Sequence, residues 1–440
     1  MRLVQRVAPT AELCDADDPQ RPVVMTGDRP RVVDKAAAVS GEAHPLRHRM
    51  QISERIDAIS AGHIVFSRAD REFPYGPTPS LAVVADSNLR GVTMEELQLS
   101  TRNHGILLEA LRFAITPVGL HYLLTHFDIP PVDPLTWRLR VDGNVAQTVS
   151  LSLDDLRAMP ATTRVVTMEC AGNGRAFLDP RPASQPWLLE AVGTGEWTGV
   201  ELHHVLALAG VRESSVEIVL TGADHGIDGG IEQAYQRSLT LDEVASTGVM
   251  LAYELNGAPL PPQHGSPLRA VVPGWYGMSN VKWLTSITAI GEPFTGYQQT
   301  VSYRLRHHEH EVGEPIRRIL PRSLMIPPGI PEFLSRSRVV PAGECPLVGR
   351  AWSGFAPIAS VEVSADGGAT WAPAEHDRQQ VDQASWIGWH FNWQATPGHH
   401  ELCCRTTDAK GNTQPDRPQW NRGGYTNNAI QRVTVHVTDW

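Results

Sequence analysis

Cysteine is scarce in this chain of 440 residues, which contains only Cys14, Cys170, Cys345, Cys403 and Cys404. These residues form no CxxC pair, no zinc-ligand spacing and no CxxCH sequence, so nothing indicates a zinc ribbon or a covalently attached haem. A sparse, odd number of cysteines is typical of free thiols rather than of a disulfide framework. A small disulfide-stabilised scaffold is therefore excluded.

Long apolar runs are also missing. No window approaches the roughly 18 apolar residues that a membrane-spanning helix requires. The first residues, 1–9, contain neither a twin-arginine pair nor an apolar signal region. We therefore expect a protein that is cytoplasmic as encoded and has no membrane span. A misassigned start codon would leave a periplasmic location open.

The chain has no excess of positive charge. Its formal net charge of −10 argues against a nucleic-acid or anionic-membrane partner. Apolar residues make up 41% of the sequence, enough for substantial cores, and 440 residues are too many for one ordinary core. The 34 prolines and 37 glycines predict many turns in an architecture that contains β-structure.

The most informative stretch is residues 165–175. A β-branched, apolar run leads to Cys170, and a Gly-Asn-Gly turn and Arg175 follow. This pattern predicts a buried strand that presents a thiol at its end, where small residues allow a ligand to approach closely. The positive charge of Arg175 would favour the thiolate, which is the form that binds metals. The alternative is a buried structural cysteine before a glycine turn.

The sequence Glu-Cys-Ala-Gly-Asn-Gly-Arg at 169–175 resembles the molybdenum-ligand motif of the sulfite oxidase family of molybdopterin enzymes. Further similar stretches occur from about Ile115 to the C-terminus. The resemblance implies a molybdenum–molybdopterin cofactor, with Cys170 as the protein's metal ligand. Because the sequence has no haem-binding motif, we expect no haem and an external electron acceptor such as a cytochrome.

The similar stretches imply further site residues. The residues expected to bind the cofactor are His126, Arg175, Asp224, His264, Arg269, Asn280, Val281 and Lys282. Besides Cys170, the expected catalytic residues are Tyr303 and Trp187. Tyr297 competes with Tyr303 for the same role, and simple core packing is the alternative for Trp187. A guanidinium and an ammonium suit the phosphate of a pyranopterin.

Two positions depart from the family pattern. Leu124 and Ser279 stand where sulfite oxidases carry arginines, so the substrate pocket is expected to be less positive. Arg102 lies upstream in an Arg-Asn-His triplet, and it would supply the missing charge if this segment folded back to the pocket.

The expected fold is α+β. We expect residues 1–70 to form a poorly ordered or surface arm, and residues 71–315 to form a mixed α/β molybdopterin-binding domain. Within that domain, Ser152 is expected to cap a short helix. Alternating strand patterns with recurring tryptophans predict an immunoglobulin-like β-sandwich at 316–440. This last part resembles the family's dimerisation domain and implies a homodimer.

Three functions remain open. The expected reaction is oxo transfer to a small sulfur compound, with sulfite to sulfate as the favoured case. The second is the same chemistry on a sulfane sulfur or a sulfoxide, which the changes at Leu124 and Ser279 favour. The third is a non-catalytic or metal-free thiol protein on the same scaffold, which the combined motif residues make improbable.

Overall fold

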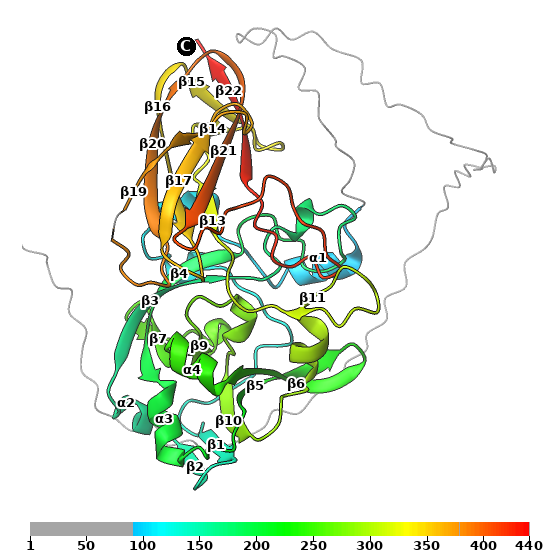
Figure 1. Ribbon diagram of the computed structural model, residues 1–440, viewed down its shortest axis with the longest axis vertical. Helices are drawn as coiled ribbons and strands as arrows, with labels where there is room; N and C mark the ends of the chain where they lie inside the picture. The colour runs from blue at the N-terminus through cyan, green and yellow to red at the C-terminus, as the bar shows by residue number, and fades with distance from the viewer. Residues whose placement is uncertain (1–90, 378, 440) are drawn as a thin grey trace, which may run out of the picture. The chain divides into compact units, whose positions relative to one another are not determined.

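A computed structural model describes residues 91–377 and 379–439 of the protein. The arm expected at 1–70 and the start of the expected cofactor domain, 71–90, lie outside the described residues. The described chain contains a mixed α/β part followed by a β-sandwich (Figure 1). The expected α+β class and its order of parts are confirmed.

Two sheets build the mixed part. The first has the strand order β2 (Val149–Leu151), β1 (Leu139–Gly143), β10 (Leu284–Ile290), β5 (Glu217–Asp228) and β6 (Ile231–Thr240). The second contains β3 (Thr162–Glu169), β4 (Val192–Glu201), β7 (Met250–Leu255) and β8 (Ala258–Pro259), and β9 (Arg269–Val271) also pairs with β7. β1 and β10 run parallel, and the other pairs in both sheets are antiparallel.

Short helices connect these strands. The α-helices are α1 (Met94–Ser100), α2 (Leu153–Arg157), α3 (Leu202–Ala209) and α4 (Leu241–Thr247). The 3-10 helices are η1 (Leu108–Arg112), η2 (Val118–Leu120), η3 (Arg175–Phe177), η4 (Pro262–His264) and η5 (Gly277–Ser279), and η6 (Gln298–Ser302) is a π-helix. Ser152 caps α2 as expected, because its hydroxyl accepts from the Asp155 amide while the Asp155 carboxylate accepts from the Ser152 amide.

The β-sandwich consists of two further sheets. One has the order β13 (Arg322–Met325), β16 (Gly343–Trp352), β20 (Ile387–Ala395) and β19 (Glu375–His376). The other has the order β14 (Ile330–Pro331), β15 (Arg338–Pro341), β22 (Gln431–Thr438), β21 (Gly398–Asp408), β17 (Ile358–Ser364) and β18 (Ala372–Pro373). A small hairpin, β11 (Arg304–Leu305) with β12 (Glu314–Pro315), precedes them. Alternating side chains of β20 and β22 are buried in the sandwich core, as a two-layer β-structure requires.

The two parts are packed against each other. Leu324, Trp352 and Trp386 belong to the same apolar cluster as the core of the mixed part. The Trp386 indole also donates to the Ala114 carbonyl at 2.7 Å, and the Arg350 guanidinium donates to the Leu111 carbonyl at 2.8 Å. The sandwich is therefore joined to the mixed part by apolar packing and by hydrogen bonds.

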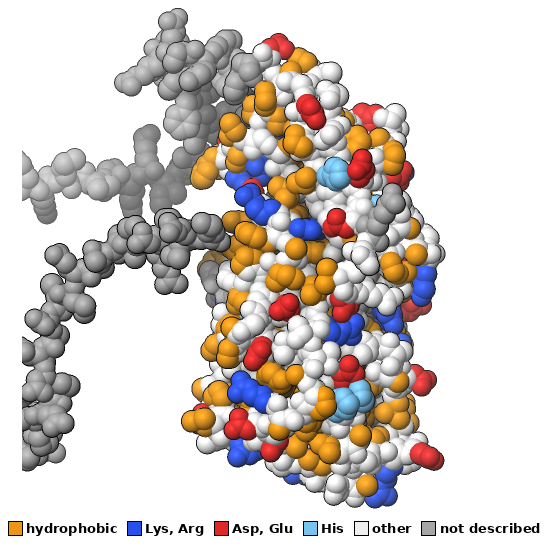
Figure 2. Space-filling model, turned by 90° about the vertical axis from the view of Figure 1, so that its left-hand side faces the viewer, with side chains coloured by type: hydrophobic (Ala, Val, Ile, Leu, Met, Phe, Trp, Pro, Cys, Tyr) orange, Lys and Arg blue, Asp and Glu red, His pale blue; other side chains and the backbone are white. Residues whose placement is uncertain are grey.

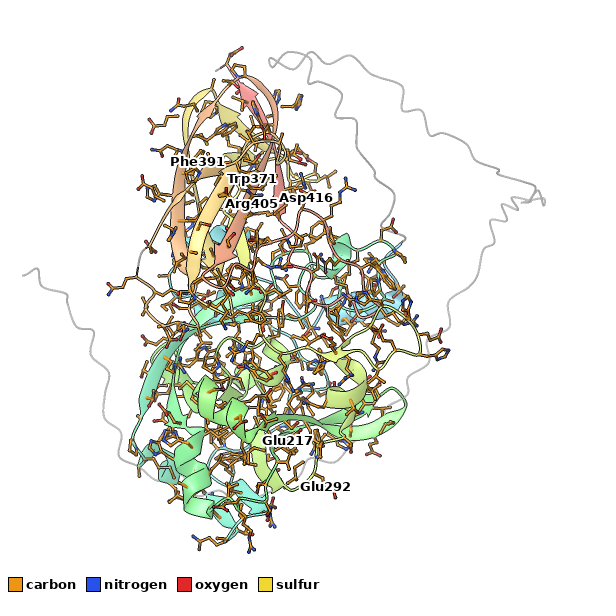
Figure 3. The ribbon with its side chains drawn as sticks, in the orientation of Figure 1. Glu217, Glu292, Trp371, Phe391, Arg405 and Asp416 are labelled. Atoms are coloured by element: carbon orange, nitrogen blue, oxygen red, sulfur yellow. The ribbon has the colours of Figure 1, made fainter. Side chains whose placement is uncertain are left out.

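The surface carries charges of both signs. On the face that Figure 2 shows, acidic and basic side chains are interspersed among apolar ones. On the sandwich, the Arg405 guanidinium lies 4.1 Å from the centre of the Trp371 ring and pairs with Glu362 at 2.8 Å (Figure 3). Among the described residues, none of the helices has the length and apolar character needed to span a bilayer.

Candidate active site

Cys170 follows the last residue of β3 and is buried. The Gly172 amide donates to its Sγ atom at 3.4 Å. The turn that follows depends on glycine, because Gly174 has a φ of +87°, in the left-handed region that side chains disfavour. Burial raises the pKa of the Cys170 thiol, and the nearby Arg175 charge opposes this effect. The local sequence thus forms a strand end with a fixed, close-packed thiol.

Cys170 lies on the wall of a cavity of about 630 Å³, a volume that includes the open mouth. Of the residues expected from the sequence, the cavity brings together His126, Cys170, Asp224, His264, Arg269, Asn280, Lys282 and Tyr303. Leu124, one of the two positions that depart from the family pattern, lines the same cavity. Segments that are far apart in the chain therefore converge on the thiol.

Cationic side chains form one part of the wall. The Arg269 guanidinium donates to the carbonyls of His264 at 3.0 Å and Asn280 at 3.1 Å, and burial lowers its pKa to about 10. The Lys282 ammonium donates to the carbonyls of Leu124 at 2.9 Å and Gln263 at 3.1 Å. Burial, and then the Arg269 charge, lowers the Lys282 pKa to about 7. An anion bound here would raise this pKa again and be held by both groups.

Asp224 supplies a carboxylate to the same cavity. It lies where the pairing of β5 with β6 is interrupted between Thr221 and His225, so this irregularity directs it away from the regular sheet. Burial raises its pKa to about 6, although the Lys282 charge opposes the shift. The group is therefore an acceptor that titrates close to neutral pH.

A histidine and two tyrosines form another part of the wall. The His126 Nε2 atom lies 2.5 Å from the Tyr303 hydroxyl, and the His126 ring stacks on Tyr235 with centres 4.6 Å apart. Burial, together with the charges of Lys282, Arg237 and Arg102, lowers the pKa of His126 to about 3. Burial also raises the pKa of Tyr303, so at neutral pH both groups are uncharged.

Three expected residues do not line this cavity. Trp187 is buried beside the thiol, and its indole favours the thiolate of Cys170. Val281 is a core residue whose carbonyl accepts from the Ala270 amide at 2.8 Å. Arg175 donates to the carbonyls of Gln185 and Gly423, both at 3.0 Å. Their roles toward a cofactor or substrate stay predictions.

The sequence reasoning missed several wall residues, among them His121, Tyr122 and Tyr235. The His121 ring meets the His264 ring edge to face at 5.5 Å, and burial lowers its pKa to about 4. His121 and Tyr122 lie within the stretch after Ile115 where the resemblance continues, so their position was an available signal. Tyr235 lies within a strand that shows no motif, and only the fold brings it to the cavity.

The cavity fits a polar, anionic ligand. Among the described residues that line the cavity, three buried side-chain atoms have no hydrogen-bond partner: His121 Nε2, Asp224 Oδ1 and Arg269 Nε. Such buried polar atoms are costly unless a ligand or water pairs with them. Together with the Cys170 thiol, they offer a soft metal ligand, a carboxylate acceptor for N–H groups and a guanidinium donor for phosphate.

Sequence comparisons identify the family to which the chain is similar. Residues 126–298 match a family model described as an oxidoreductase molybdopterin binding domain, and residues 321–438 match a Mo-co oxidoreductase dimerisation domain. Sulfite oxidase of Gallus gallus is 34% identical over 360 residues, which cover 74% of this chain and 73% of the relative. Mitochondrial sulfite oxidase of Mus musculus is also 34% identical, over 73% of this chain and 62% of the relative. Nitrate reductase [NAD(P)H] of Hordeum vulgare is 31% identical, over 73% of this chain and 39% of the relative.

The structure is also similar to a solved one. The sulfane dehydrogenase SoxCD from Paracoccus pantotrophus matches with a TM-score of 0.65 and 24% identity, over 83% of this chain and 97% of that one. The fold and the sequence matches define a molybdopterin-binding oxidoreductase. The chain belongs to the sulfite oxidase family of molybdenum-cofactor oxidoreductases, within which it is also similar to nitrate reductases.

Proposed function

We propose that the protein is a molybdenum-cofactor-dependent oxidoreductase that transfers an oxygen atom to a sulfur compound, with sulfite to sulfate as the favoured reaction. The observation that carries this proposal is the convergence of Cys170, Asp224, Arg269 and Lys282 on one cavity. The electrons would pass to an external acceptor such as a cytochrome. The match to a dimerisation domain supports a homodimer.

The residues of the cavity have separable tasks. Cys170 would bind the metal through Sγ, Arg269 and Lys282 would hold the phosphate, and Asp224 would accept hydrogen bonds from pterin N–H groups. When bound, the cofactor supplies the oxygen-atom and two-electron chemistry. The protein's own contribution is to position the cofactor and to provide charges and hydrogen bonds.

Tyr303 and His126 are the groups suited to orient the reacting oxygen. Both are uncharged at neutral pH and are joined by their short contact, so the pair can donate a hydrogen bond without adding net charge. Tyr297, the competing tyrosine, is not part of the cavity wall. Tyr303 is therefore the tyrosine we assign to this role.

A second substrate class is supported by the apolar side chain of Leu124 in the cavity wall. The other departing position, Ser279, is buried and also contributes no charge. A pocket with fewer fixed cations selects less strongly for a small dianion. A sulfane sulfur or a sulfoxide is therefore the alternative substrate for the same chemistry.

Elemental analysis and a steady-state assay test the proposal in sequence. The expected result is one molybdenum per chain in the purified protein, with turnover of sulfite in the presence of an artificial electron acceptor. If the protein is produced in cells that supply the molybdenum cofactor and still purifies without molybdenum, the proposal is contradicted and a metal-free thiol protein is favoured. Molybdenum without sulfite turnover would instead favour the alternative substrate.

A further inference from the structure

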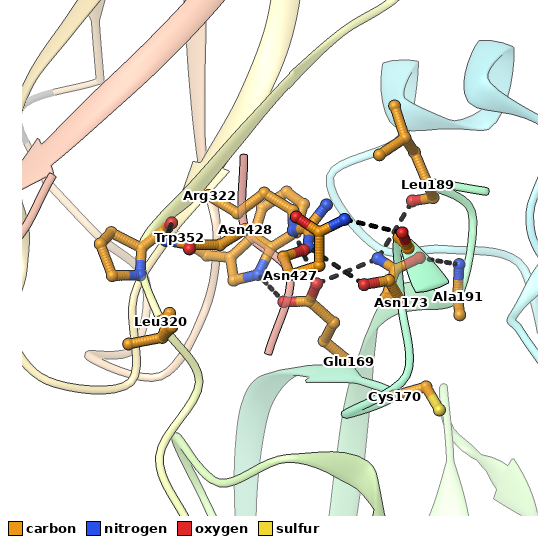
Figure 4. Close-up of polar contacts among 12 residues, drawn as sticks. Glu169, Cys170, Asn173, Leu189, Ala191, Leu320, Arg322, Trp352, Asn427 and Asn428 are labelled. Carbon is orange, nitrogen blue, oxygen red and sulfur yellow. Dashed lines mark hydrogen bonds and ion pairs between the residues drawn. The ribbon is translucent and has the colours of Figure 1, made fainter. Parts of the chain in front are cut away.

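A buried ion pair connects the β-sandwich to the residue that precedes Cys170. Arg322 is the first residue of β13, and Glu169 is the last residue of β3. The Arg322 Nε atom lies 2.7 Å from Glu169 Oε1, and both side chains are only 1% exposed. The Trp352 indole donates to the other carboxylate oxygen at 2.8 Å, and the Asn173 side-chain amide donates to Oε1 at 3.0 Å (Figure 4). The carboxylate is thus held from both domains.

A second set of contacts joins the sandwich to the other side of Cys170. The Arg322 guanidinium donates to the Asn427 carbonyl, and the Asn427 side-chain amide donates to the Gly174 carbonyl at 2.7 Å. The Thr426 amide donates to the Ala171 carbonyl, also at 2.7 Å. Residues on both sides of Cys170 are therefore attached to the sandwich, while the thiol itself points away from this network (Figure 4).

We propose that Arg322 is a positioning residue: through Glu169 and Asn427 it fixes the backbone that carries the Cys170 thiol. The role of that thiol as metal ligand rests on the proposed function. A buried arginine with charge-assisted partners holds a defined geometry, and loss of one member leaves the other charge uncompensated. The sandwich would thus complete the active site in addition to offering a dimerisation surface.

The chain contains a matched control pair. Arg338 in β15 also belongs to the sandwich, its side chain is 5% exposed, and it pairs with Glu109 of η1 at 3.0 Å. That pair also joins the sandwich to the mixed part, but among the described residues it makes no hydrogen bond or ion pair with the cysteine turn. Comparing Arg322→Met with Arg338→Met therefore separates positioning of Cys170 from attachment of the sandwich in general.

The test measures amide hydrogen exchange in the peptide that spans residues 170–175, together with the molybdenum content of the purified protein. The Asn173 and Arg175 amides are hydrogen-bonded within this turn, to the Cys170 and Gly172 carbonyls at 3.0 Å. We expect Arg322→Met to accelerate their exchange about tenfold or more, which corresponds to at least roughly 1.4 kcal/mol of local opening. Molybdenum content should fall at least about twofold, because supporting residues around a metal ligand contribute to metal affinity. Arg338→Met should change neither quantity in this peptide.

Unchanged exchange in Arg322→Met, or the same acceleration in Arg338→Met, would overturn the proposal. If Arg322→Met does not fold, the neutral double variant Glu169→Gln/Arg322→Gln replaces it, because it leaves no buried charge unpaired. Faster exchange is still expected in that variant, since amide contacts are weaker than charge-assisted ones; wild-type exchange would overturn the proposal. Because exchange can be measured with or without bound metal, a protein without molybdenum would refute the proposed function while this readout still tests the positioning role.

Discussion

At the residue scale, the cavity combines groups whose protonation states are set by burial. His121, His126 and His264 all have lowered pKa values, of about 4, 3 and 2, so they are neutral at pH 7. Arg269 keeps its charge, and Lys282 titrates near pH 7. The permanent positive charge of the cavity is therefore concentrated on Arg269, and Lys282 adds to it when an anion is present.

The first prediction follows from Arg269. Arg269→Ala should lower the retention of cofactor more than the turnover per bound molybdenum. A phosphate that loses a buried charged partner is destabilised by roughly 2–5 kcal/mol. Pterin and molybdenum content per chain, with turnover normalised to molybdenum, measure the two effects separately. Arg405→Ala in the sandwich is the control, and full pterin content in Arg269→Ala would remove Arg269 from the cofactor site.

The second prediction concerns Asp224 and pH. Its folded-state pKa of about 6 lies above the ordinary value of 3.8, so the folded state binds this proton more tightly than the unfolded state does. Stability from this group is present below about pH 4 and is lost as the pH rises to about 6. At roughly 1.4 kcal/mol per pKa unit, the loss amounts to about 3 kcal/mol.

The corresponding measurement is denaturant unfolding of cofactor-free protein between pH 4 and 7. Relative to Asp224→Asn, the wild type should lose about 3 kcal/mol of unfolding free energy across this window. Parallel pH profiles for the two proteins would show that Asp224 is not a strained, buried carboxyl group.

At the element scale, the upstream segment lies beside the segment that carries Leu124. His104 and Leu123 form an antiparallel bridge, and the Asn103 side chain accepts from the Thr125 amide at 2.7 Å. Arg102 is exposed, and its charge contributes to the low pKa of His126. The fold-back that the sequence left open is therefore present, although Arg102 does not line the cavity.

The third prediction is that Leu124→Arg increases kcat/KM for sulfite by about tenfold or more. Roughly 1.4 kcal/mol of added transition-state stabilisation gives that factor. The gain should shrink as ionic strength rises, because salt screens an exposed charge. Leu124→Met is the matched control, because it changes the shape of the side chain without adding charge and should not increase kcat/KM for sulfite.

Arg102 provides the competing outcome. If the unmodified protein already binds sulfite tightly, if Arg102→Ala abolishes that binding, and if substitutions at 124 have no effect, then the anion-binding charge resides on the upstream segment. In that case Arg102 supplies the charge that an arginine at position 124 would supply, and the pocket selects sulfite equally well.

At the scale of the whole molecule, site residues within contiguous motifs could be predicted from the sequence. Contacts between residues far apart in the sequence could not. Cys170, Arg269 and Lys282 lie in stretches that resemble family motifs, and the structure places them on one cavity. Ser152 was predictable because helix capping depends on residues three positions apart. Tyr235 carries no such signal, since a tyrosine in an alternating strand is an ordinary core residue.

The contact between Glu169 and Arg322 shows the same limit. Each residue is unremarkable in its own segment, and only the docking of the sandwich makes them partners. The sequence also predicted cofactor binding by Val281 and Arg175 and a catalytic role for Trp187, and these roles stay predictions. The structure places these residues near the cysteine turn or in the core, away from the cavity wall, because neighbouring residues in a motif point in different directions.

The central claim is that Cys170 binds molybdenum through its sulfur atom. X-ray absorption at the molybdenum edge measures this most directly, because it counts the sulfur ligands of the metal. We predict that Cys170→Ser loses one sulfur from the coordination shell and about 100-fold or more of its oxidation rate, exceeding the loss typical of an outer partner. Its far-ultraviolet circular dichroism should match that of the wild type. An unchanged sulfur count with wild-type turnover would contradict the account.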